Sequence, residues 1–274
     1  MTDRRRPDSA RRDRAALIDT TVPNAVRVGD YLEGGRDNFE ADRRAVRALV
    51  AAGPVTVTIA PAMRAFHLRA MRYLIAEAGI RQFLDAGTGL AMTGKTHQVA
   101  QSLAPECRVV YADDDPMVLA RTRALQASAP YGAVASVEGD LSDPAEILSG
   151  ATQVLDFSRP VAFVLMATLT YIVDDAAAAE ILLALTGAAA AGSCVVLAHQ
   201  ASDLGPAMPA VARRWNAMSE QRIELRSRAR LTELLTGLEL VPPGIVPVTD
   251  WRPAADDPRF DLVVPIHGIV ARKP

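Results

Sequence analysis

The sequence predicts an α/β fold, with an open and largely parallel sheet whose strands are separated by helices. Two observations lead to this prediction. From Ile80 onward, short apolar runs alternate with stretches of helical periodicity, a pattern typical of a parallel sheet with crossover helices. The first of these runs, Gln82–Ala86, also leads into the turn Asp85-Ala86-Gly87-Thr88-Gly89, and a glycine-rich turn after a strand lets the backbone approach a bound nucleotide closely.

The composition excludes several classes of protein. Half of the 274 residues are hydrophobic and 23% are charged, as expected for a globular chain with a sizeable core. The net charge of −2 gives no electrostatic signal for binding nucleic acid or an anionic membrane. No uncharged apolar run reaches the roughly 18 residues that a membrane helix needs. The two cysteines, Cys107 and Cys194, fall in strand-like stretches, so we expect a reducing, cytoplasmic location.

Two regions are expected to precede the sheet domain. The first fourteen residues hold six arginines and three aspartates, so residues 1–17 are predicted to be a basic, disordered leader. Residues 18–79 are predicted to form a polar, glycine-bearing loop from Pro23 to Asn38 and then a helical cap. In this cap, Phe39–Ala52 has helical periodicity, and a second helix is expected over Pro61–Ala78 with Pro61 in its first turn. Residues 80–274 form the predicted main domain.

The elements of the main domain follow from the apolar runs and the helix-start signals. Strands are expected over Gln82–Ala86, Arg108–Ala112, Ala133–Val137, Val161–Met166 and Cys194–His199, and helices over Thr96–Leu103, Pro116–Gln126, Pro144–Leu148 and Ala176–Ala190. Asp115-Pro116 and Asp143-Pro144 support two of these helix starts, because each offers an N-cap followed by a proline in the first turn. The last section predicts helices over Ala207–Met218 and Arg228–Leu235 and strands over Ile245–Val248 and Leu262–Val270.

Acidic residues follow three successive predicted strands. Asp85 stands at the first glycine turn, Asp113 and Asp114 follow the second strand, and Asp140 with Leu141 follows the third. Ligands of open α/β sheets bind outside the carboxyl ends of the strands, so these residues are candidate ligand contacts. Asp113 follows Gly87 by 26 residues, close to the spacing of about 20 at which an acidic residue binds a ribose diol.

The acidic residue at the glycine turn also indicates which kind of cofactor binds. A carboxylate at Asp85 would repel a pyrophosphate, whereas it suits S-adenosylmethionine, which carries an ammonium and a sulfonium and no phosphate. The glycines at 87, 89 and 94 also fit poorly to the G-x-G-x-x-G pattern of dinucleotide sites. S-adenosylmethionine is therefore the predicted cofactor. A non-catalytic protein that senses this cofactor remains an alternative, and a nicotinamide-dependent oxidoreductase is disfavoured.

Several motifs are shared with a known family. They are Pro23-Asn24-Ala25-Val26-Arg27, Asp30-Tyr31-Leu32, Phe83-Leu84-Asp85-Ala86-Gly87-Thr88-Gly89, Val109-Val110-Tyr111-Ala112-Asp113-Asp114-Asp115-Pro116, Asp156-Phe157-Ser158-Arg159-Pro160 and Val241-Pro242-Pro243-Gly244. On these residues, the chain from Ile18 to Lys273 resembles a bacterial group of class I S-adenosylmethionine-dependent methyltransferases formerly catalogued as a domain of unknown function (DUF574-like). The resemblance implies a Rossmann-like, doubly wound, seven-stranded sheet whose last strand, Leu262–Val270, is antiparallel and pairs in a hairpin with the strand before it.

The resemblance also implies the residues of the cofactor site. They lie at the strand ends and in the N-terminal loop: Asp85, Gly87 and Gly89 at the methionine end, Asp113 at the ribose, Asp114, Asp140 and Leu141 at the adenine, and Tyr31 and Asn38 from the loop. The methyl acceptor is expected to be a small molecule, and nothing in the sequence indicates the oligomeric state.

The residues around the transfer site depart from the family pattern. Ala91-Met92 stands in place of a Pro-Thr pair, Lys95 in place of an asparagine, and Thr170-Tyr171 in place of a histidine-aromatic pair. His199, after the fifth strand, and His97, near the glycine turn, are the candidate general bases. No residues have the spacing of metal ligands, so no metal is expected.

Overall fold

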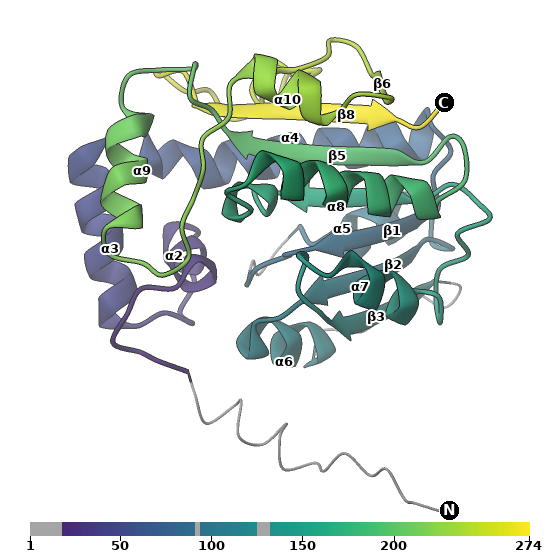
Figure 1. Ribbon diagram of the computed structural model, residues 1–274, viewed down its shortest axis with the longest axis horizontal. Helices are drawn as coiled ribbons and strands as arrows, with labels where there is room; N and C mark the ends of the chain where they lie inside the picture. The colour runs from purple at the N-terminus through teal and green to yellow at the C-terminus, as the bar shows by residue number, and fades with distance from the viewer. Residues whose placement is uncertain (1–17, 91–93, 125–131) are drawn as a thin grey trace, which may run out of the picture.

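An eight-stranded sheet lies at the centre of the computed structural model, which describes residues 18–90, 94–124 and 132–274 (Figure 1). The strands are β1 (Gln82–Ala86), β2 (Arg108–Asp113), β3 (Ala133–Glu138), β4 (Ala162–Met166), β5 (Cys194–Gln200), β6 (Glu239–Leu240), β7 (Val246–Pro247) and β8 (Ile266–Arg272). Their order is β3-β2-β1-β4-β5-β8-β6, with β7 also paired to β8. The first five strands are parallel, and β8 is antiparallel to β5, β6 and β7.

The sheet confirms the predicted α/β, doubly wound architecture. The chain starts in the middle at β1, runs outward to β3, and then returns to β4 on the other side of β1. The switch point between these two halves therefore lies beside β1, where ligands of such sheets bind. The antiparallel last strand is also confirmed. Two details differ from the prediction. The short strands β6 and β7 both pair with the last strand, where one strand was expected. The last strand, β8, begins at Ile266 rather than Leu262, and Leu262 and Val263 are exposed.

Helices cover both faces of the sheet. On one face, α4 (Thr56–Ala76) and α5 (Thr96–Leu103) pack on the sheet through a core that includes Phe66, Leu74 and Val109. On the other face, α7 (Pro144–Ala151), α8 (Asp175–Ala188) and α10 (Arg228–Leu234) pack through a core that includes Ile147, Leu182 and Leu231. The central strands are buried on both sides, which explains why they appear in the sequence as continuous apolar runs. Helix α6 (Pro116–Ala124) contacts β2 and β3.

A cap stands beyond the carboxyl ends of the parallel strands (Figure 1). It consists of α2 (Ala25–Leu32), α3 (Glu40–Ala52) and α9 (Met208–Asn216), which share a core containing Val28, Leu49 and Trp215. The cap thus draws on two distant stretches of the chain, while α4, which lies within the expected 18–79 unit, packs mainly on the sheet. The division of the chain at residue 79 stays a prediction.

Two sequence-based expectations for the cap region are wrong. The segment from Pro23 to Asn38 is not a loop throughout, because α2 forms within it, with the Asn24 side chain accepting hydrogen bonds from the Val26 and Arg27 backbone N–H groups. The second helix begins at Thr56, so Pro61 lies inside it rather than in its first turn. The Thr56 hydroxyl donates to the Gly53 carbonyl, which closes the chain reversal between α3 and α4 and allows this earlier start.

Some expectations fall outside the described residues. These are the leader over residues 1–17, the Ala91-Met92 pair and the end of the helix expected over Pro116–Gln126. Within the described residues, no single helix has the length and apolar composition to cross a membrane, although α3 and α4 meet those criteria as a pair bent by 100°.

Candidate functional site

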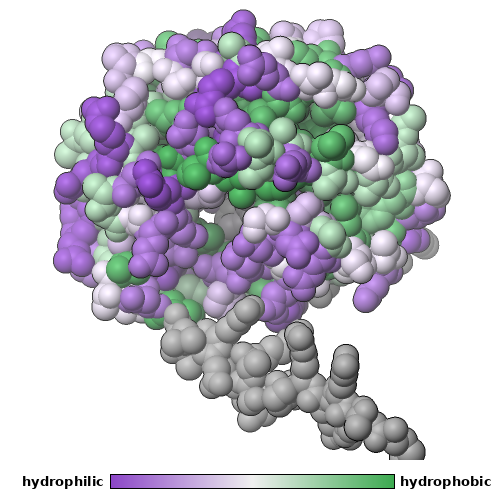
Figure 2. All heavy atoms as spheres, in the orientation of Figure 1, coloured by the Kyte–Doolittle hydropathy of each residue, from purple (hydrophilic) through white to green (hydrophobic). Residues whose placement is uncertain are grey.

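A cavity of about 760 Å³ lies between the cap and the carboxyl ends of β1, β2 and β4. The space-filling view is hollowed at this place (Figure 2). The volume falls within the range of roughly 300–1,000 Å³ that is common for small-molecule sites. Of the residues expected at the cofactor from the sequence, seven line this cavity: Asp85, Gly87, Gly89, Asp113, Asp114, Asp140 and Leu141.

The glycine turn after β1 needs glycine at two positions. Gly87 and Gly89 have φ angles of +73° and +63°, a left-handed conformation that residues with a side chain rarely adopt. A Cβ atom on Gly87 would also lie 2.5 Å from Cγ2 of Thr168. The Thr168 hydroxyl donates to the Ala86 carbonyl at 2.7 Å, so the loop after β4 packs directly against this turn. The turn and the loop after β4 therefore form one continuous wall of the cavity.

Asp85 is held by a chain of hydrogen bonds behind the turn. The Thr96 hydroxyl donates to Asp85 Oδ2 at 2.5 Å, and Nε2 of His67 lies 3.0 Å from the same hydroxyl oxygen. Because the threonine proton goes to the carboxylate, His67 Nε2 donates, and the lone pair of the neutral imidazole is on Nδ1. Burial raises the pKa of Asp85 to about 6 and lowers the pKa of His67 to about 4. His67 also lines the cavity, and the sequence analysis missed it.

Lys95 lies between the two acidic strand ends. Its Nζ donates to the Gly89 carbonyl at 3.2 Å, and it lies 5.5 Å from the centre of the Tyr111 ring. Burial lowers the pKa of Lys95, whereas the charges of Asp85 and Asp113 raise it. The lysine that departs from the family pattern thus partly offsets the negative charge of this end of the cavity.

Asp113 ends β2 and is only 7% exposed. Its Oδ1 accepts the backbone N–H of Asp115 at 2.9 Å, while Oδ2 is buried without a hydrogen-bond partner in the described part of the chain. Burial raises the pKa of Asp113 to about 7, and the nearby Asp114, Asp115 and Asp85 add to the shift. A buried carboxylate oxygen that lacks a donor is unfavourable, so this position suits a ligand that brings hydroxyl groups.

The remaining sequence candidates lie elsewhere. Neither Tyr31 nor Asn38 is among the described residues that line the cavity. The Asn38 amide instead donates to Asp30 Oδ2 at 2.8 Å and to the Gly35 carbonyl at 3.0 Å, which fixes the loop after α2. A Cβ atom on Gly35 would meet Asp30 Oδ1 at 2.0 Å, so that loop closes only around a glycine.

Both candidate histidines also lie away from the cavity lining. His97 lies in the first turn of α5, and its Nδ1 bonds to the Tyr111 hydroxyl at 2.8 Å. His199 is fully buried, and its Nε2 accepts from Arg226 at 2.8 Å while Nδ1 lies 2.9 Å from the Gln200 carbonyl. Burial lowers the pKa of His199 to about 3, so it is a neutral partner of Arg226. Within the described chain, no group of three or more His, Cys, Asp or Glu residues is arranged to hold a metal ion.

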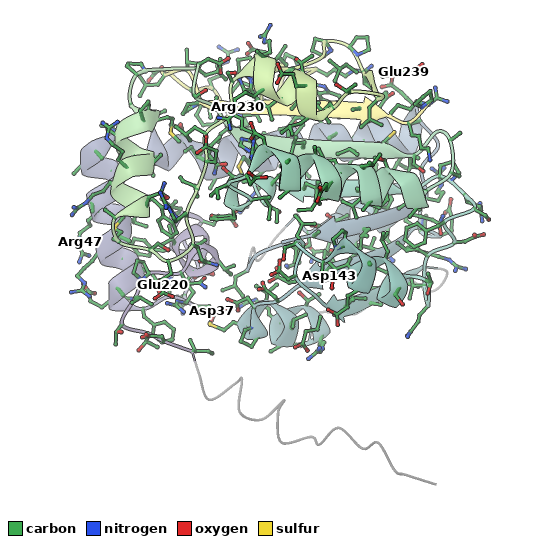
Figure 3. All side chains as sticks on the ribbon, viewed as in Figure 1. Asp37, Arg47, Asp143, Glu220, Arg230 and Glu239 are labelled. Atoms are coloured by element: carbon green, nitrogen blue, oxygen red, sulfur yellow. The ribbon has the colours of Figure 1, made fainter. Side chains whose placement is uncertain are left out.

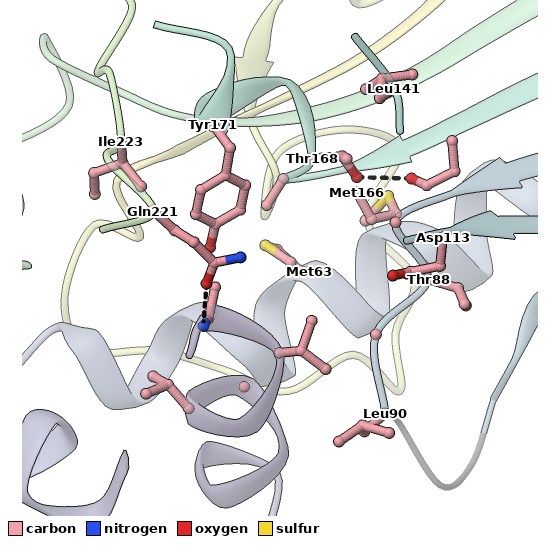
Figure 4. Close-up of a pocket in the computed structure, with 18 of the residues that line it drawn as sticks. Met63, Thr88, Leu90, Asp113, Leu141, Met166, Thr168, Tyr171, Gln221 and Ile223 are labelled. Carbon is pink, nitrogen blue, oxygen red and sulfur yellow. Dashed lines mark hydrogen bonds between the residues drawn. The ribbon is translucent and has the colours of Figure 1, made fainter. Parts of the chain in front are cut away.

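The cavity has a second end that the sequence did not indicate. It is lined by Met63 of α4, Tyr171 after β4, and the segment that follows α9 (Figure 4). In that segment Glu220 is exposed (Figure 3), and Gln221 Oε1 accepts the backbone N–H of Ala25 at 2.8 Å. Because these residues meet only through tertiary packing, no spacing in the sequence could have grouped them.

Replacing Thr96 by valine should weaken cofactor binding. Asp85 would lose its shortest donor, so its pKa would rise further and less of the carboxylate would be ionised near neutral pH. We expect about a tenfold loss of affinity for S-adenosylhomocysteine, measured by calorimetric titration at pH 6.5. Thr122→Val is the matched control, since that buried hydroxyl has no partner in the described chain and lies outside the cavity lining. Equal affinities for the two variants would contradict the role given to Thr96.

Comparisons with known proteins identify similar chains. A family model described as S-adenosyl methyltransferase matches residues 11–274. A DUF574 family protein from Streptomyces avermitilis MA-4680 is 40% identical, with a TM-score of 0.89, over 94% of this chain and 100% of that one. A candidate methyltransferase from Thermobifida fusca YX is 35% identical, with a TM-score of 0.86, over 93% and 96% of the two chains.

More distant structures share the fold alone. A magnesium protoporphyrin IX methyltransferase from Synechocystis PCC 6803 is 13% identical, with a TM-score of 0.51, over 97% of this chain and 100% of that one. Among curated proteins, none matches the sequence.

Proposed function

The chain belongs to the S-adenosyl methyltransferase family, and on that premise we propose that it transfers a methyl group from S-adenosylmethionine to a small molecule held beneath the cap. The observation that best supports this proposal is the buried, unpartnered oxygen of Asp113, at the end of β2 and in the same cavity as Asp85 and the glycine turn. Such an oxygen needs a hydroxyl donor, and the ribose of the cofactor offers two.

In this proposal the cofactor lies along the strand ends. Asp113 would accept from the ribose hydroxyls, Asp114, Asp140 and Leu141 would hold the adenine, and Asp85 with the glycine turn would hold the methionine part; all of these residues line the cavity. The negative charge of Asp85 favours the ammonium of that part. When bound, S-adenosylmethionine would supply an electrophilic methyl group on its sulfonium.

The protein contributes alignment and the exclusion of water. Methyl transfer to a good nucleophile needs little beyond the correct placement of the two reactants. The cap helices and the loop after β4 enclose the space next to the glycine turn and supply that placement. Of the four histidines, His67 is the one among the lining residues; because burial lowers its pKa to about 4, it is a neutral imidazole that can accept a hydrogen bond from an acceptor but is a weak base.

Two measurements test this function. In thermal-shift assays, S-adenosylmethionine and S-adenosylhomocysteine should each raise the melting temperature, because a ligand that binds only the folded state stabilises it, whereas NADH should not. Stabilisation by NADH alone would overturn the proposal in favour of an oxidoreductase. On incubation with S-adenosylmethionine and a metabolite mixture, S-adenosylhomocysteine should be released. Cofactor binding without any such release would instead favour a non-catalytic sensor.

A further inference from the structure

We propose that the methyl acceptor is an uncharged, predominantly apolar molecule with a hydroxyl or N–H group, which binds in the end of the cavity beneath the cap and hydrogen-bonds to the Tyr171 hydroxyl. This inference rests on the methyltransferase function proposed above. We call this end of the cavity the acceptor chamber. Six of its residues carry the argument: Ile59, Met63, Tyr171, Val211, Trp215 and Ile223.

The acceptor chamber is separate from the strand-end site. Figure 4 shows Asp113 and Thr88 on one side of the cavity, and Tyr171, Met63 and Ile223 on the other. The side chains on the first side are those that suit a nucleoside, because Oδ2 of the buried Asp113 lacks a donor within the described chain. The second side stays available for a second molecule when a nucleoside occupies the first.

The walls of the acceptor chamber are mainly apolar. Ile59 and Met63 come from α4, Val211 and Trp215 from α9, and Ile223 from the segment after α9. The indole N–H of Trp215 donates to the Gln221 carbonyl at 2.5 Å, so it is already satisfied and the ring presents carbon to the chamber. A ligand gains most from such walls by burying apolar surface of its own.

The charged side chains that line this end are of both signs, and they are either paired with each other or exposed. Arg64 and Glu33 form an ion pair at 2.7 Å, and Glu220 and Arg222 are exposed. At the strand ends, acidic residues outnumber the single lysine, Lys95. A carboxylate or phosphate on the acceptor would therefore lose its hydration next to a negatively charged site, which is strongly unfavourable.

Tyr171 provides the polar group of the acceptor chamber. Its hydroxyl points toward Met63 and Gln221 (Figure 4), and it makes no hydrogen bond within the described chain. Tyr171 is 37% exposed, and partial desolvation raises its pKa above the ordinary value of 10, so the phenol stays protonated near neutral pH and can both donate and accept. The turn that carries it is fixed, because the buried Arg226 donates to the Leu169 carbonyl at 3.1 Å and to the Ile172 carbonyl at 2.6 Å.

Three naphthalene probes test the inference by calorimetric titration in the presence of saturating S-adenosylhomocysteine. The probes are 2-naphthol, 2-naphthoate and naphthalene, which share a ring system and differ in the polar group. We expect 2-naphthol to bind at least about tenfold more tightly than 2-naphthoate, because the carboxylate must be desolvated. Tyr171→Phe should lower the affinity for 2-naphthol by roughly fivefold, the loss expected for one neutral hydrogen bond. The affinity for naphthalene, which has no polar group, should not change.

The control variant is Tyr73→Phe, because the Tyr73 ring packs against Trp251 away from the cavity lining. Tyr73→Phe should leave the affinities of all three probes unchanged. Titration of S-adenosylhomocysteine alone separates the two proposals. If that ligand fails to bind the wild-type protein, the proposed function fails. If it binds, the acceptor inference is overturned when 2-naphthoate binds as tightly as 2-naphthol, when Tyr171→Phe has no effect on 2-naphthol, or when none of the probes binds.

Discussion

Replacing Asp113 by asparagine is expected to make the free protein more stable and, at the same time, to remove most of its affinity for S-adenosylmethionine. The carboxylate is buried next to other acidic groups, and its pKa of about 7 means that the ionised form is unfavourable in the folded protein. Asparagine can still accept the Asp115 N–H through its amide oxygen, without the charge. The shift from 3.8 to about 7, at about 1.4 kcal/mol per pKa unit, sets an upper limit of about 4 kcal/mol; because the asparagine amide is polar and buried as well, we expect the free energy of unfolding at pH 8 to rise by about 2 kcal/mol.

The pH dependence of this gain has a definite sign. The pKa of Asp113 is raised from an ordinary value of 3.8, so its protonation stabilises the fold at low pH, and that contribution is lost as the pH rises toward 7. The advantage of Asp113→Asn should therefore be full at pH 8 and small near pH 4. Urea unfolding at the two pH values measures it, with the exposed Asp256→Asn as the control. A variant less stable than wild type at pH 8 would contradict the assignment.

The loss of cofactor affinity should be about a hundredfold or more. Asp113 is assigned two hydrogen bonds from ribose hydroxyls to a charged acceptor, and each such bond contributes roughly 1.5–3 kcal/mol. Calorimetric titration with S-adenosylhomocysteine measures the change. An affinity within threefold of wild type would mean that this carboxylate does not bind the ribose.

Replacing Asp42 by alanine should produce the largest loss of stability in the cap. Asp42 Oδ2 accepts from Nε of Arg27 at 2.9 Å, and both side chains are buried. The same carboxylate accepts the backbone N–H groups of Phe39 at 2.8 Å and Asn24 at 3.0 Å, so it joins the starts of α2 and α3. Its removal leaves the guanidinium of Arg27 buried without a counter-charge. We expect a cost of about 3–5 kcal/mol.

Urea unfolding and hydrogen exchange measure this effect. Amide protons of α2 and α3 should exchange faster in Asp42→Ala than in wild type. Binding of 2-naphthol should weaken, because Val28 of α2 and Leu49 of α3 also line the cavity and α3 packs on α9, which forms part of the chamber wall. Glu40→Ala is the control on the same helix, because Glu40 pairs with Arg43 and Arg47 at the exposed surface, where ion pairs contribute little. If Asp42→Ala is no less stable than Glu40→Ala, the buried pair does not hold the cap together.

Much of the sheet could be predicted because each central strand is buried on both faces. The predicted bounds of Gln82–Ala86 and of the helix Thr96–Leu103 agree with β1 and α5. Helix α2 was missed because it is only 8 residues long and contains Gly29, although Ala25, Val28 and Leu32 form an apolar face on it. It depends on the Asn24 cap, on the ion pair between Arg27 and Asp42 and on packing with α3, which itself packs on the distant α9.

The site could be predicted only where the sheet itself brings residues together. Carboxyl ends of parallel strands converge at one edge, and Asp85, Asp113 and Asp140 accordingly line one cavity. The acceptor chamber follows no such rule, since Met63, Tyr171 and Trp215 come from separate helices and loops.

The most direct test of the account is a crystal structure of the protein in complex with S-adenosylhomocysteine. The account predicts that the carboxylate of Asp113 lies within hydrogen-bond distance of both ribose hydroxyls, and that the ammonium lies beside the glycine turn near Asp85. A nucleoside bound elsewhere in the molecule, or a ribose that makes no contact with Asp113, would contradict it.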